Sequence, residues 1–249
     1  MSQKSAIEKL KNKKIYSVEG NIGAGKTTIL KIIGQKLDDV EFVEEPVSIW
    51  QNLGGDNLLE KFYENPERWG FSFEFYCMLS KINALCKIAD TTKPFIVLER
   101  SLFSNKIFMD ISKKLGKLND MEYTMLMNTY DLYIQHVYPH LSGIIYLNTP
   151  VNLCINRIIN RNRGEESGVD VEYLTLLEKS FNKFINECTI PTLQINGNFD
   201  IVRDSTTIGK NIHNFMSNRT ENKVEALHIF NNNIFQVLAG WNIIKYIIK

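Results

Sequence analysis

The stretch that most constrains this chain is Gly-Asn-Ile-Gly-Ala-Gly-Lys-Thr-Thr at 20–28, which fits the phosphate-binding pattern G-x-x-x-x-G-K-[ST]. An apolar run at 15–18 predicts a buried strand before it, and a helical pattern of apolar residues follows it. Glycines let backbone N–H groups face a phosphate chain, and the helix N-terminus behind them adds partial positive charge. The candidate phosphate-binding residues are Gly20, Asn21, Ile22, Gly23, Ala24, Gly25, Lys26, Thr27 and Thr28.

Strands and helices alternate along the rest of the chain. Apolar runs at 40–43, 95–98, 143–147 and 192–195 predict four more strands, with helical patterns between them. Such alternation favours right-handed crossovers and a parallel sheet covered on both faces. We therefore expect an α/β chain with the three-layer P-loop kinase fold: a five-stranded parallel sheet, helices on both faces and an arginine-bearing lid. Ligands of such a sheet bind at its C-terminal edge.

Composition limits the class of protein. The net charge of +1 gives no bias toward nucleic acid, and no window holds the ~20 apolar residues of a membrane span. Four cysteines lie far apart without a C-x-x-C pair, and the polar N-terminus has no secretory pattern, so we expect a reduced, cytoplasmic protein. The expected parts are a frayed polar arm at 1–12, one domain at 13–217 and an extension of unknown role at 218–249, which a terminal helix docked on the domain explains most simply.

Further motifs occur in a fixed order after the loop. They are Glu45-Pro46-Val47 with Trp50, Tyr63 with the Pro-Glu-Arg-Trp stretch at 66–69, Glu99-Arg100-Ser101, and the Arg-Asn-Arg-Gly-Glu-Glu stretch at 161–166. With the phosphate loop, this order resembles the deoxynucleoside kinases, the family of the deoxycytidine, deoxyguanosine and mitochondrial thymidine kinases and the insect multisubstrate enzyme. The resemblance covers about residues 13–215. The loop alone is shared by many families, whereas the combination is specific.

The resemblance implies ATP-dependent phosphorylation of a deoxynucleoside 5′-hydroxyl, giving the monophosphate for nucleotide salvage. It makes Glu45 the general base and Arg100 the group that orients that base and the hydroxyl. Lys26 would act on the transferring phosphates, and Thr27 and Glu99 would hold Mg²⁺. From the residues alone, Glu45 is also explained as part of a solvated acidic pair, and Glu99 with Arg100 as a structural ion pair.

A lid over a triphosphate needs cations, and guanidinium groups suit phosphate oxygens. The resemblance assigns that role to Arg157, Arg161 and Arg163, although a charged helix end is also explained by solvation. It also implies that Tyr63 and Glu166 hold the sugar 3′-hydroxyl. Trp50 would stack on the base. Burial in the core explains both aromatic residues equally well.

The base-reading positions depart from the family pattern. Glu74 stands where a glutamine is usual, and Lys81 and Asn105 replace an arginine and an aspartate. The aromatic position opposite the stacking tryptophan falls on Met109 without a gap, or on Phe108 after a one-residue shift.

An ionised Glu74 would offer only acceptors, which suits the two adjacent donors of guanine and predicts a preference for deoxyguanosine. Two alternatives stay open. Lys81 neutralises Glu74 in an ion pair away from the base, or burial keeps Glu74 protonated and therefore similar to glutamine.

Other functions compete with this interpretation. A nucleoside monophosphate kinase similar to thymidylate kinase would have to hold a second phosphate where the carboxylate of Glu45 stands, and that carboxylate would repel it. A nucleotide-dependent switch protein would want D-x-x-G and N-K-x-D stretches, which are absent from the sequence. A subunit without turnover would not need the intact catalytic set. The family is mostly dimeric, and helices at 66–90 and 120–138 are the candidates for a homodimer contact.

Overall fold

The structure is a computed structural model that describes residues 3–34, 37–136, 138 and 140–217. The extension expected at 218–249 lies outside the described residues. Along the chain the elements are α1 (Gln3–Leu10), β1 (Lys14–Gly20), α2 (Lys26–Gly34), β2 (Val40–Val43), α3 (Val47–Gln51), α4 (Leu58–Glu64), α5 (Pro66–Lys87), β3 (Phe95–Glu99), α6 (Leu102–Lys114), α7 (Asp120–His136), β4 (Gly143–Asn148), α8 (Val151–Arg161), the 3-10 helix η1 (Gly164–Gly168), α9 (Val171–Glu187), β5 (Thr192–Asn196) and α10 (Ile201–Ser217).

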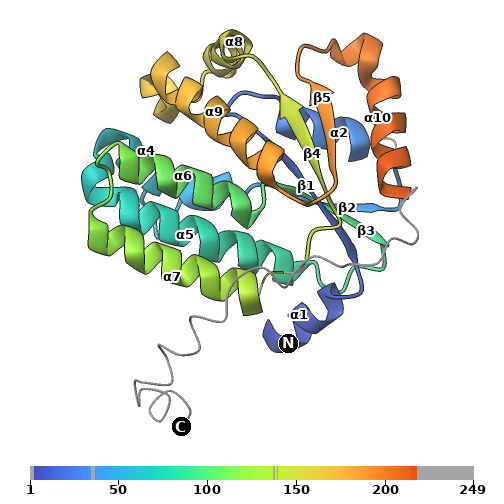
Figure 1. Cartoon of the computed structure of the whole chain (residues 1–249), viewed down its shortest axis with the longest axis horizontal. Helices are drawn as coiled ribbons and strands as arrows, with labels where there is room; N and C mark the ends of the chain where they lie inside the picture. Colours follow the sequence, from blue (N-terminus) through green and yellow to red (C-terminus); the bar gives the residue numbers. More distant parts are fainter. Residues whose placement is uncertain (1–2, 35–36, 137, 139, 218–249) are drawn as a thin grey trace. The chain divides into compact units, whose positions relative to one another are not determined.

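The five strands form one parallel sheet in the order β2-β3-β1-β4-β5 (Figure 1). β1 lies in the centre, where Ile15 aligns with Ile96 of β3 and Ser17 with Ile144 of β4. Its side chains are buried on both faces, as a parallel sheet under two helical layers requires. The expected fold class is therefore confirmed.

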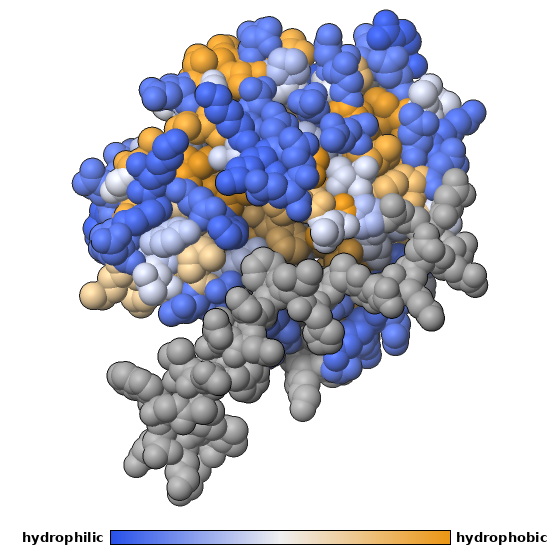
Figure 2. Space-filling model, in the orientation of Figure 1, coloured by the Kyte–Doolittle hydropathy of each residue, from blue (hydrophilic) through white to orange (hydrophobic). Residues whose placement is uncertain are grey.

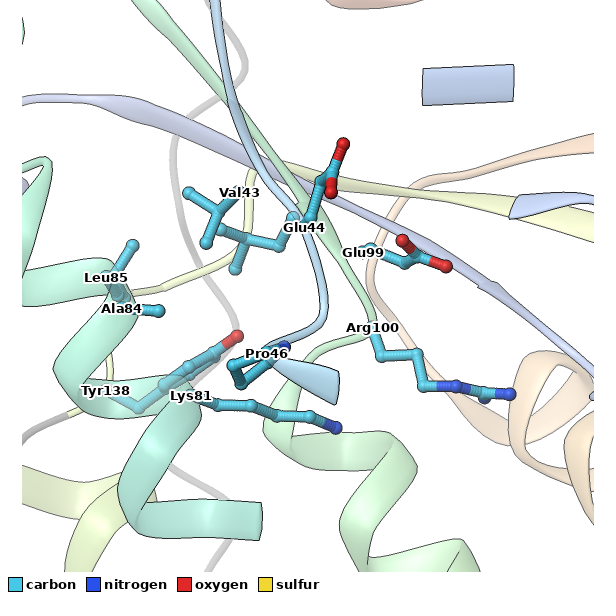
Figure 3. A pocket seen from close by; sticks show the side chains of 10 residues that line it. Val43, Glu44, Pro46, Lys81, Ala84, Leu85, Glu99, Arg100 and Tyr138 are labelled. Atoms are coloured by element: carbon cyan, nitrogen blue, oxygen red, sulfur yellow. The ribbon is translucent and has the colours of Figure 1, made fainter. Parts of the chain in front are cut away.

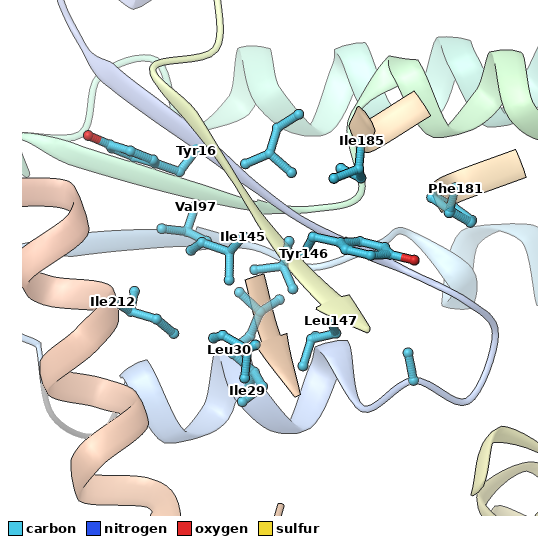
Figure 4. Packing of buried hydrophobic residues seen from close by; sticks show 14 of the residues in the cluster. Tyr16, Ile29, Leu30, Val97, Ile145, Tyr146, Leu147, Phe181, Ile185 and Ile212 are labelled. Carbon is cyan, nitrogen blue, oxygen red and sulfur yellow. The ribbon is translucent and has the colours of Figure 1, made fainter. Parts of the chain in front are cut away.

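Helices cover both faces of the sheet. Ile29 and Leu30 of α2 and Ile212 of α10 pack against one face, and Phe181 and Ile185 of α9 pack against the other (Figure 4). Helix α6 lies beside α9, α5 lies on the other side of α6, and α7 packs against both α5 and α6. This arrangement leaves the carboxyl ends of the strands free to form a site.

Side-chain caps fix where several helices begin. Asn65 Oδ1 accepts a hydrogen bond from Arg68 N at 3.1 Å, and Pro66 follows at the first position of α5. Ser101 Oγ caps α6 in the same way, and Asp170 Oδ1 caps α9. These caps set the rotation of α5 and α6, and hence the direction of the side chains predicted to read the base.

One local expectation is wrong. Residues 3–10 form a helix rather than a frayed arm, because Ala6 and Leu10 share one helix face and are buried against Leu85 and Ile96. After Pro46 the chain enters the short helix α3, since proline is compatible with the start of a helix.

Within the described parts of the chain, no helix combines the length and the apolar composition needed to cross a bilayer. Figure 2 shows one face of the molecule, on which hydrophilic residues predominate and apolar residues form smaller groups among them.

Candidate active site

The phosphate loop joins β1 to α2, and residues of neighbouring elements contact it and bind its carbonyl oxygens. Gly23 has a φ of 75°, and a Cβ there would lie 2.5 Å from the carbonyl oxygen of Cys154, so only glycine fits beside α8. The carbonyl oxygen of Ala24 accepts hydrogen bonds from Thr149 Oγ1 at 3.0 Å and from Arg157 Nη1 at 2.7 Å. The loop is therefore held in shape by contacts from β4 and α8.

Arg157 of α8 contacts the phosphate loop with its side chain. It does not lie with the other two candidate lid arginines, Arg161 and Arg163. Besides Ala24 it binds the carbonyl oxygen of Gly197 at 2.8 Å, and its guanidinium carbon lies 5.5 Å from the ring centre of Phe199. Gly197 and Phe199 follow β5 in a polar stretch without a recognisable motif, so the sequence alone did not indicate these contacts. Arg157 thus joins the loop to the segment between β5 and α10.

Lys26 is buried at the centre of the loop. Its ammonium donates to the carbonyl oxygen of Asn21 at 2.8 Å and faces that of Gly20 at 3.4 Å. Burial and the charge of Arg100 lower the pKa of Lys26 to about 7, although the carboxylate of Glu99 opposes that shift. An anionic phosphate in this loop would favour the charged ammonium.

Thr27 and Glu99 bring two oxygen ligands together. Thr27 Oγ1 donates to Glu99 Oε1 at 2.6 Å, across the edge between α2 and the end of β3. A hydroxyl and a carboxylate are hard oxygen donors that suit Mg²⁺, which takes few protein ligands and completes its shell with phosphates and water. Among the described residues, no group of three or more acidic, cysteine or histidine side chains is placed to hold a metal ion.

Glu45 lies between two cations. Its Oε1 is 3.2 Å from Lys81 Nζ, and its Oε2 is 3.4 Å from Arg100 Nε. Burial disfavours the charged carboxylate, but Lys81 and Arg100 outweigh it and lower the pKa of Glu45 below its ordinary value. The side chain of Glu45 remains 17% exposed, so its ionised carboxylate stays accessible to a molecule bound at this sheet edge.

Arg100 adopts a left-handed backbone conformation, with a φ of 63°. Its Nη1 donates to the carbonyl oxygen of Gly20 at 2.9 Å, and its guanidinium carbon lies 4.9 Å from the ring centre of Phe108. A non-glycine residue in this region is strained and persists when its surroundings hold it. The contacts with Gly20 and Phe108 are therefore part of the surroundings that hold Arg100 in this strained conformation.

Glu19, which no sequence motif indicated, binds the residues that follow Arg100 and helps to hold its backbone conformation. Its carboxylate accepts from Ser101 N at 2.8 Å, from Ser101 Oγ at 2.5 Å and from the hydroxyl of Ser104. The available signal was a charged residue inside the apolar strand that leads into the phosphate loop. A fully buried carboxylate in that strand requires partners, and it finds them in the segment that begins α6.

Figure 3 shows a pocket beside the end of β3, where Glu99 and Arg100 lie. Its lining comes from β2 and its continuation, from α5, from the end of β3 and from the segment after α7, namely Val43, Glu44, Pro46, Lys81, Ala84, Leu85, Leu98, Glu99, Arg100 and Tyr138. The side chains of Lys81 and Arg100 run in the same direction, away from the apolar part of the pocket.

The lid segment, residues 161–168, contains the end of α8 and η1. Arg161 Nε donates to Glu166 Oε2 at 2.7 Å, and Arg163 Nη1 donates to Glu166 Oε1 at 3.0 Å. Burial and the charge of Glu166 raise the pKa of Tyr63 well above its ordinary value, so its hydroxyl stays protonated. The structure thus brings Tyr63, Glu166 and these two arginines together.

The neighbouring carboxylate, Glu165, points to other partners that the sequence did not reveal. It accepts from Gln51 Nε2 at 2.8 Å and from Asn57 Nδ2 at 2.9 Å. These amides flank the turn between α3 and α4, so the lid segment is tied to the part of the chain that carries Trp50 and Tyr63.

Trp50 is buried in an apolar cluster with residues of α4 and α5. Its indole nitrogen donates to Ser80 Oγ at 2.8 Å, and its ring meets Phe73 edge-on with 5.6 Å between centres. A base could contact only the small part of this ring that stays exposed.

Glu74, Lys81 and Asn105 face one another between α5 and α6. Lys81 Nζ donates to Asn105 Oδ1 at 3.0 Å, while its ion pair is with Glu45 and, among the described residues, none joins it to Glu74. Burial raises the pKa of Glu74 to about 8, against the charge of Lys81 and a hydrogen bond with Asn105. Of the alternatives left open by the sequence, a protonated Glu74 agrees best with this environment.

Met109 and Phe108 lie on different faces of α6. Met109, one turn after Asn105, is fully buried with Met78 of α5, on the side of Glu74. Phe108 instead packs against α9, under the guanidinium of Arg100. The ungapped match, which assigns Met109 to the base side, agrees with these directions.

Comparisons with known proteins agree with this geometry. A family model described as deoxynucleoside kinase matches residues 16–219. A probable deoxycytidine kinase of fowlpox virus is 35% identical over 218 residues, covering 84% of this chain and 90% of its own length. The deoxycytidine kinase of Mus musculus is 32% identical over 252 residues, covering 92% and 95%. The mitochondrial deoxyguanosine kinase of Xenopus laevis is 29% identical over 225 residues, covering 77% and 84%.

The family match covers most of the chain, and the resemblance found in the sequence is confirmed. Family membership carries with it a nucleotide as the phosphoryl donor. A phosphate loop, a carboxylate and a pair of hard oxygen donors meet at one sheet edge, an arrangement compatible with phosphoryl transfer to a hydroxyl. The chain belongs to the deoxynucleoside kinase family and is a transferase that phosphorylates deoxynucleosides.

Proposed function

We propose that the protein transfers the γ-phosphoryl group of ATP to the 5′-hydroxyl of a deoxynucleoside, with Mg²⁺, in nucleotide salvage. The observation that carries the proposal is the carboxylate of Glu45, held between Lys81 and Arg100 beside the phosphate loop. An ionised carboxylate accepts a proton from a neutral hydroxyl and repels an acceptor that already bears a phosphate.

Each remaining residue has a role that follows from its chemistry. Lys26 and the loop N–H groups would bind the phosphates of ATP, with Arg161 and Arg163 closing from the lid segment. Thr27 and Glu99 would hold Mg²⁺, which when bound neutralises charge on the phosphate oxygens. Arg100 would orient Glu45 and the attacking hydroxyl through its fixed fork.

The nucleoside would lie between α4, α5 and α6. Tyr63 and Glu166 would bind the 3′-hydroxyl, the phenol as a donor and the carboxylate as an acceptor. Arg161 and Arg163 bind the same carboxylate, so Glu166 would contact both the nucleoside and the arginines that bind ATP. Trp50 would contribute apolar contacts with the base through the small exposed part of its ring.

The test is identification of the product. Purified protein with γ-labelled ATP, Mg²⁺ and each deoxynucleoside should give a labelled monophosphate with phosphorus on the 5′ oxygen. The matching 5′-deoxy analogue, which lacks the acceptor hydroxyl, should give none. Labelled product from that analogue would place the acceptor elsewhere and contradict the proposal.

We further propose that the site accepts several deoxynucleosides near neutral pH, deoxycytidine among them, because a protonated Glu74 offers one donor and one acceptor, which matches cytosine, thymine and adenine. As pH rises through about 8, Glu74 ionises and comes to favour the donor edge of guanine. The ratio of kcat/KM for deoxycytidine to that for deoxyguanosine should fall at least about fourfold between about pH 6.5 and 8.5.

Glu74→Gln should keep that ratio constant, and Glu67→Gln on the exposed first turn of α5 is the matched control. A ratio that does not change with pH in the wild type would show that Glu74 does not read the base.

A homodimer through α5 and α7 is also proposed. The described residues expose large apolar side chains on these helices, among them Met125 and Leu132 at 50% and 55%. A monomer rarely leaves such a row of apolar side chains exposed, so a second copy is the simplest partner.

Analytical ultracentrifugation should find a dimer that the pair Met125→Lys and Leu132→Lys converts to monomer. Val171→Lys, at an equally exposed apolar residue of α9, should leave the dimer intact. A monomeric wild type would refute this contact.

A further inference from the structure

Lys81 occupies a position that the base-reading role alone does not explain. It lies in the middle of α5, and its side chain is only 8% exposed. One ammonium contacts two polar groups from different elements, Glu45 Oε1 at 3.2 Å and Asn105 Oδ1 at 3.0 Å. The first follows β2 and the second belongs to α6, so Lys81 connects segments far apart in the sequence.

These contacts are part of a longer chain of polar groups. Asn105 also lies close enough to Glu74 to oppose the rise that burial causes in the pKa of Glu74. Polar contacts therefore link Glu45, Lys81 and Asn105, and Glu74 lies beside Asn105 at the end of this series.

We propose that Lys81 is a positioning residue, which orients the carboxylate of Glu45 and couples it to the base-reading end of the site. The proposal rests on the function proposed above, because it concerns how Glu45 is prepared for catalysis. A buried lysine is a suitable link, since its ammonium has three donors on a flexible stem and can serve two acceptors together.

Glu45 is faced by charges from three elements: Lys81 on α5, Arg100 after β3 and Lys26 at the start of α2. The nearby thiol of Cys77 stays neutral, because burial raises its pKa well above the ordinary value. Removing Lys81 leaves two cations near Glu45, so catalysis should weaken and shift in pH without disappearing.

The experiment compares pH profiles of kcat for the wild type, Lys81→Met and Lys81→Arg. The methionine variant keeps an apolar stem without charge and should move the acid limb of the profile about one pH unit higher, because an opposite charge at this distance favours the ionised carboxylate. The arginine variant retains the charge and should restore most of the wild-type profile. Lys106→Met removes a lysine at the surface of α6 whose ion pair, among the described residues, is with Asp110, and it should leave the profile unchanged.

The coupling has its own readout. Asn105→Ala should move the acid limb of kcat in the wild type, and should add little in the Lys81→Met background, because the series of contacts is already broken. Equal effects of Asn105→Ala in both backgrounds would overturn the coupling. Lys81→Gln provides a second uncharged variant, and thermal unfolding identifies any variant that has lost its fold.

A pH profile of Lys81→Met that coincides with that of the wild type would overturn the positioning role while leaving the kinase proposal intact. Failure of the proposed function is seen separately, as a wild type that does not phosphorylate deoxynucleosides.

Discussion

Lys26→Ala should reduce phosphoryl transfer by at least about 10²- to 10³-fold while the protein stays folded, the range seen when one donor that stabilises transition-state charge is removed. The ammonium of Lys26 is buried in the loop and donates to the carbonyl oxygen of Asn21, so it lies where the phosphates of ATP would bind. Steady-state kcat/KM with ATP and a deoxynucleoside measures the loss.

Lys31→Ala is the matched control, because it removes an exposed lysine from the last turn of the same helix, α2. It should retain wild-type activity. Turnover near the wild-type level in Lys26→Ala would mean that the loop does not serve phosphoryl transfer.

Glu45→Gln should lower kcat by about 10²- to 10⁴-fold, the usual contribution of a general base. The amide preserves the shape of the carboxylate but cannot accept the proton of the 5′-hydroxyl. Nucleoside affinity, measured by calorimetry, should survive because the base and sugar contacts come from other residues.

The pH dependence gives this prediction a second readout. Lys81 and Arg100 lower the pKa of Glu45 against the effect of burial, so the base is ionised throughout the neutral range and is lost only as pH falls through that lowered pKa. The acid limb of wild-type activity should therefore lie below the ordinary range of a carboxyl group. Glu64→Gln, at the exposed end of α4, should change neither rate nor profile. A loss smaller than about tenfold in Glu45→Gln would remove Glu45 from this role.

The sheet could be predicted because its strands are short apolar runs between helical patterns. Val40–Val43 has the expected bounds, and the other strands differ by one or two residues at their ends. The approach of Glu45, Glu99 and Arg100 also follows from sequence, since the carboxyl ends of parallel strands meet at one edge. Their catalytic roles remain predictions that the variants above test.

Contacts that depend on how helices pack could not be predicted. The pairing of Lys81 with Glu45 depends on the rotation of α5 against the segment after β2, and the clamp of Arg157 on Ala24 depends on where α8 crosses the loop. The tie from Glu165 to Asn57 joins residues 108 positions apart, which no periodic pattern encodes. The pKa of Glu74 likewise depends on burial between two helices, and the protonated carboxyl that results no longer favours guanine, as an ionised Glu74 would.

The most direct test of the central claim is a comparison of acceptors under identical conditions, with γ-labelled ATP and Mg²⁺ offered to the four deoxynucleosides and to their 5′-monophosphates. The carboxylate of Glu45 beside the phosphate loop predicts labelled monophosphates from the nucleosides and no transfer to the monophosphates. Transfer to the monophosphates, with none to the nucleosides, would contradict the account.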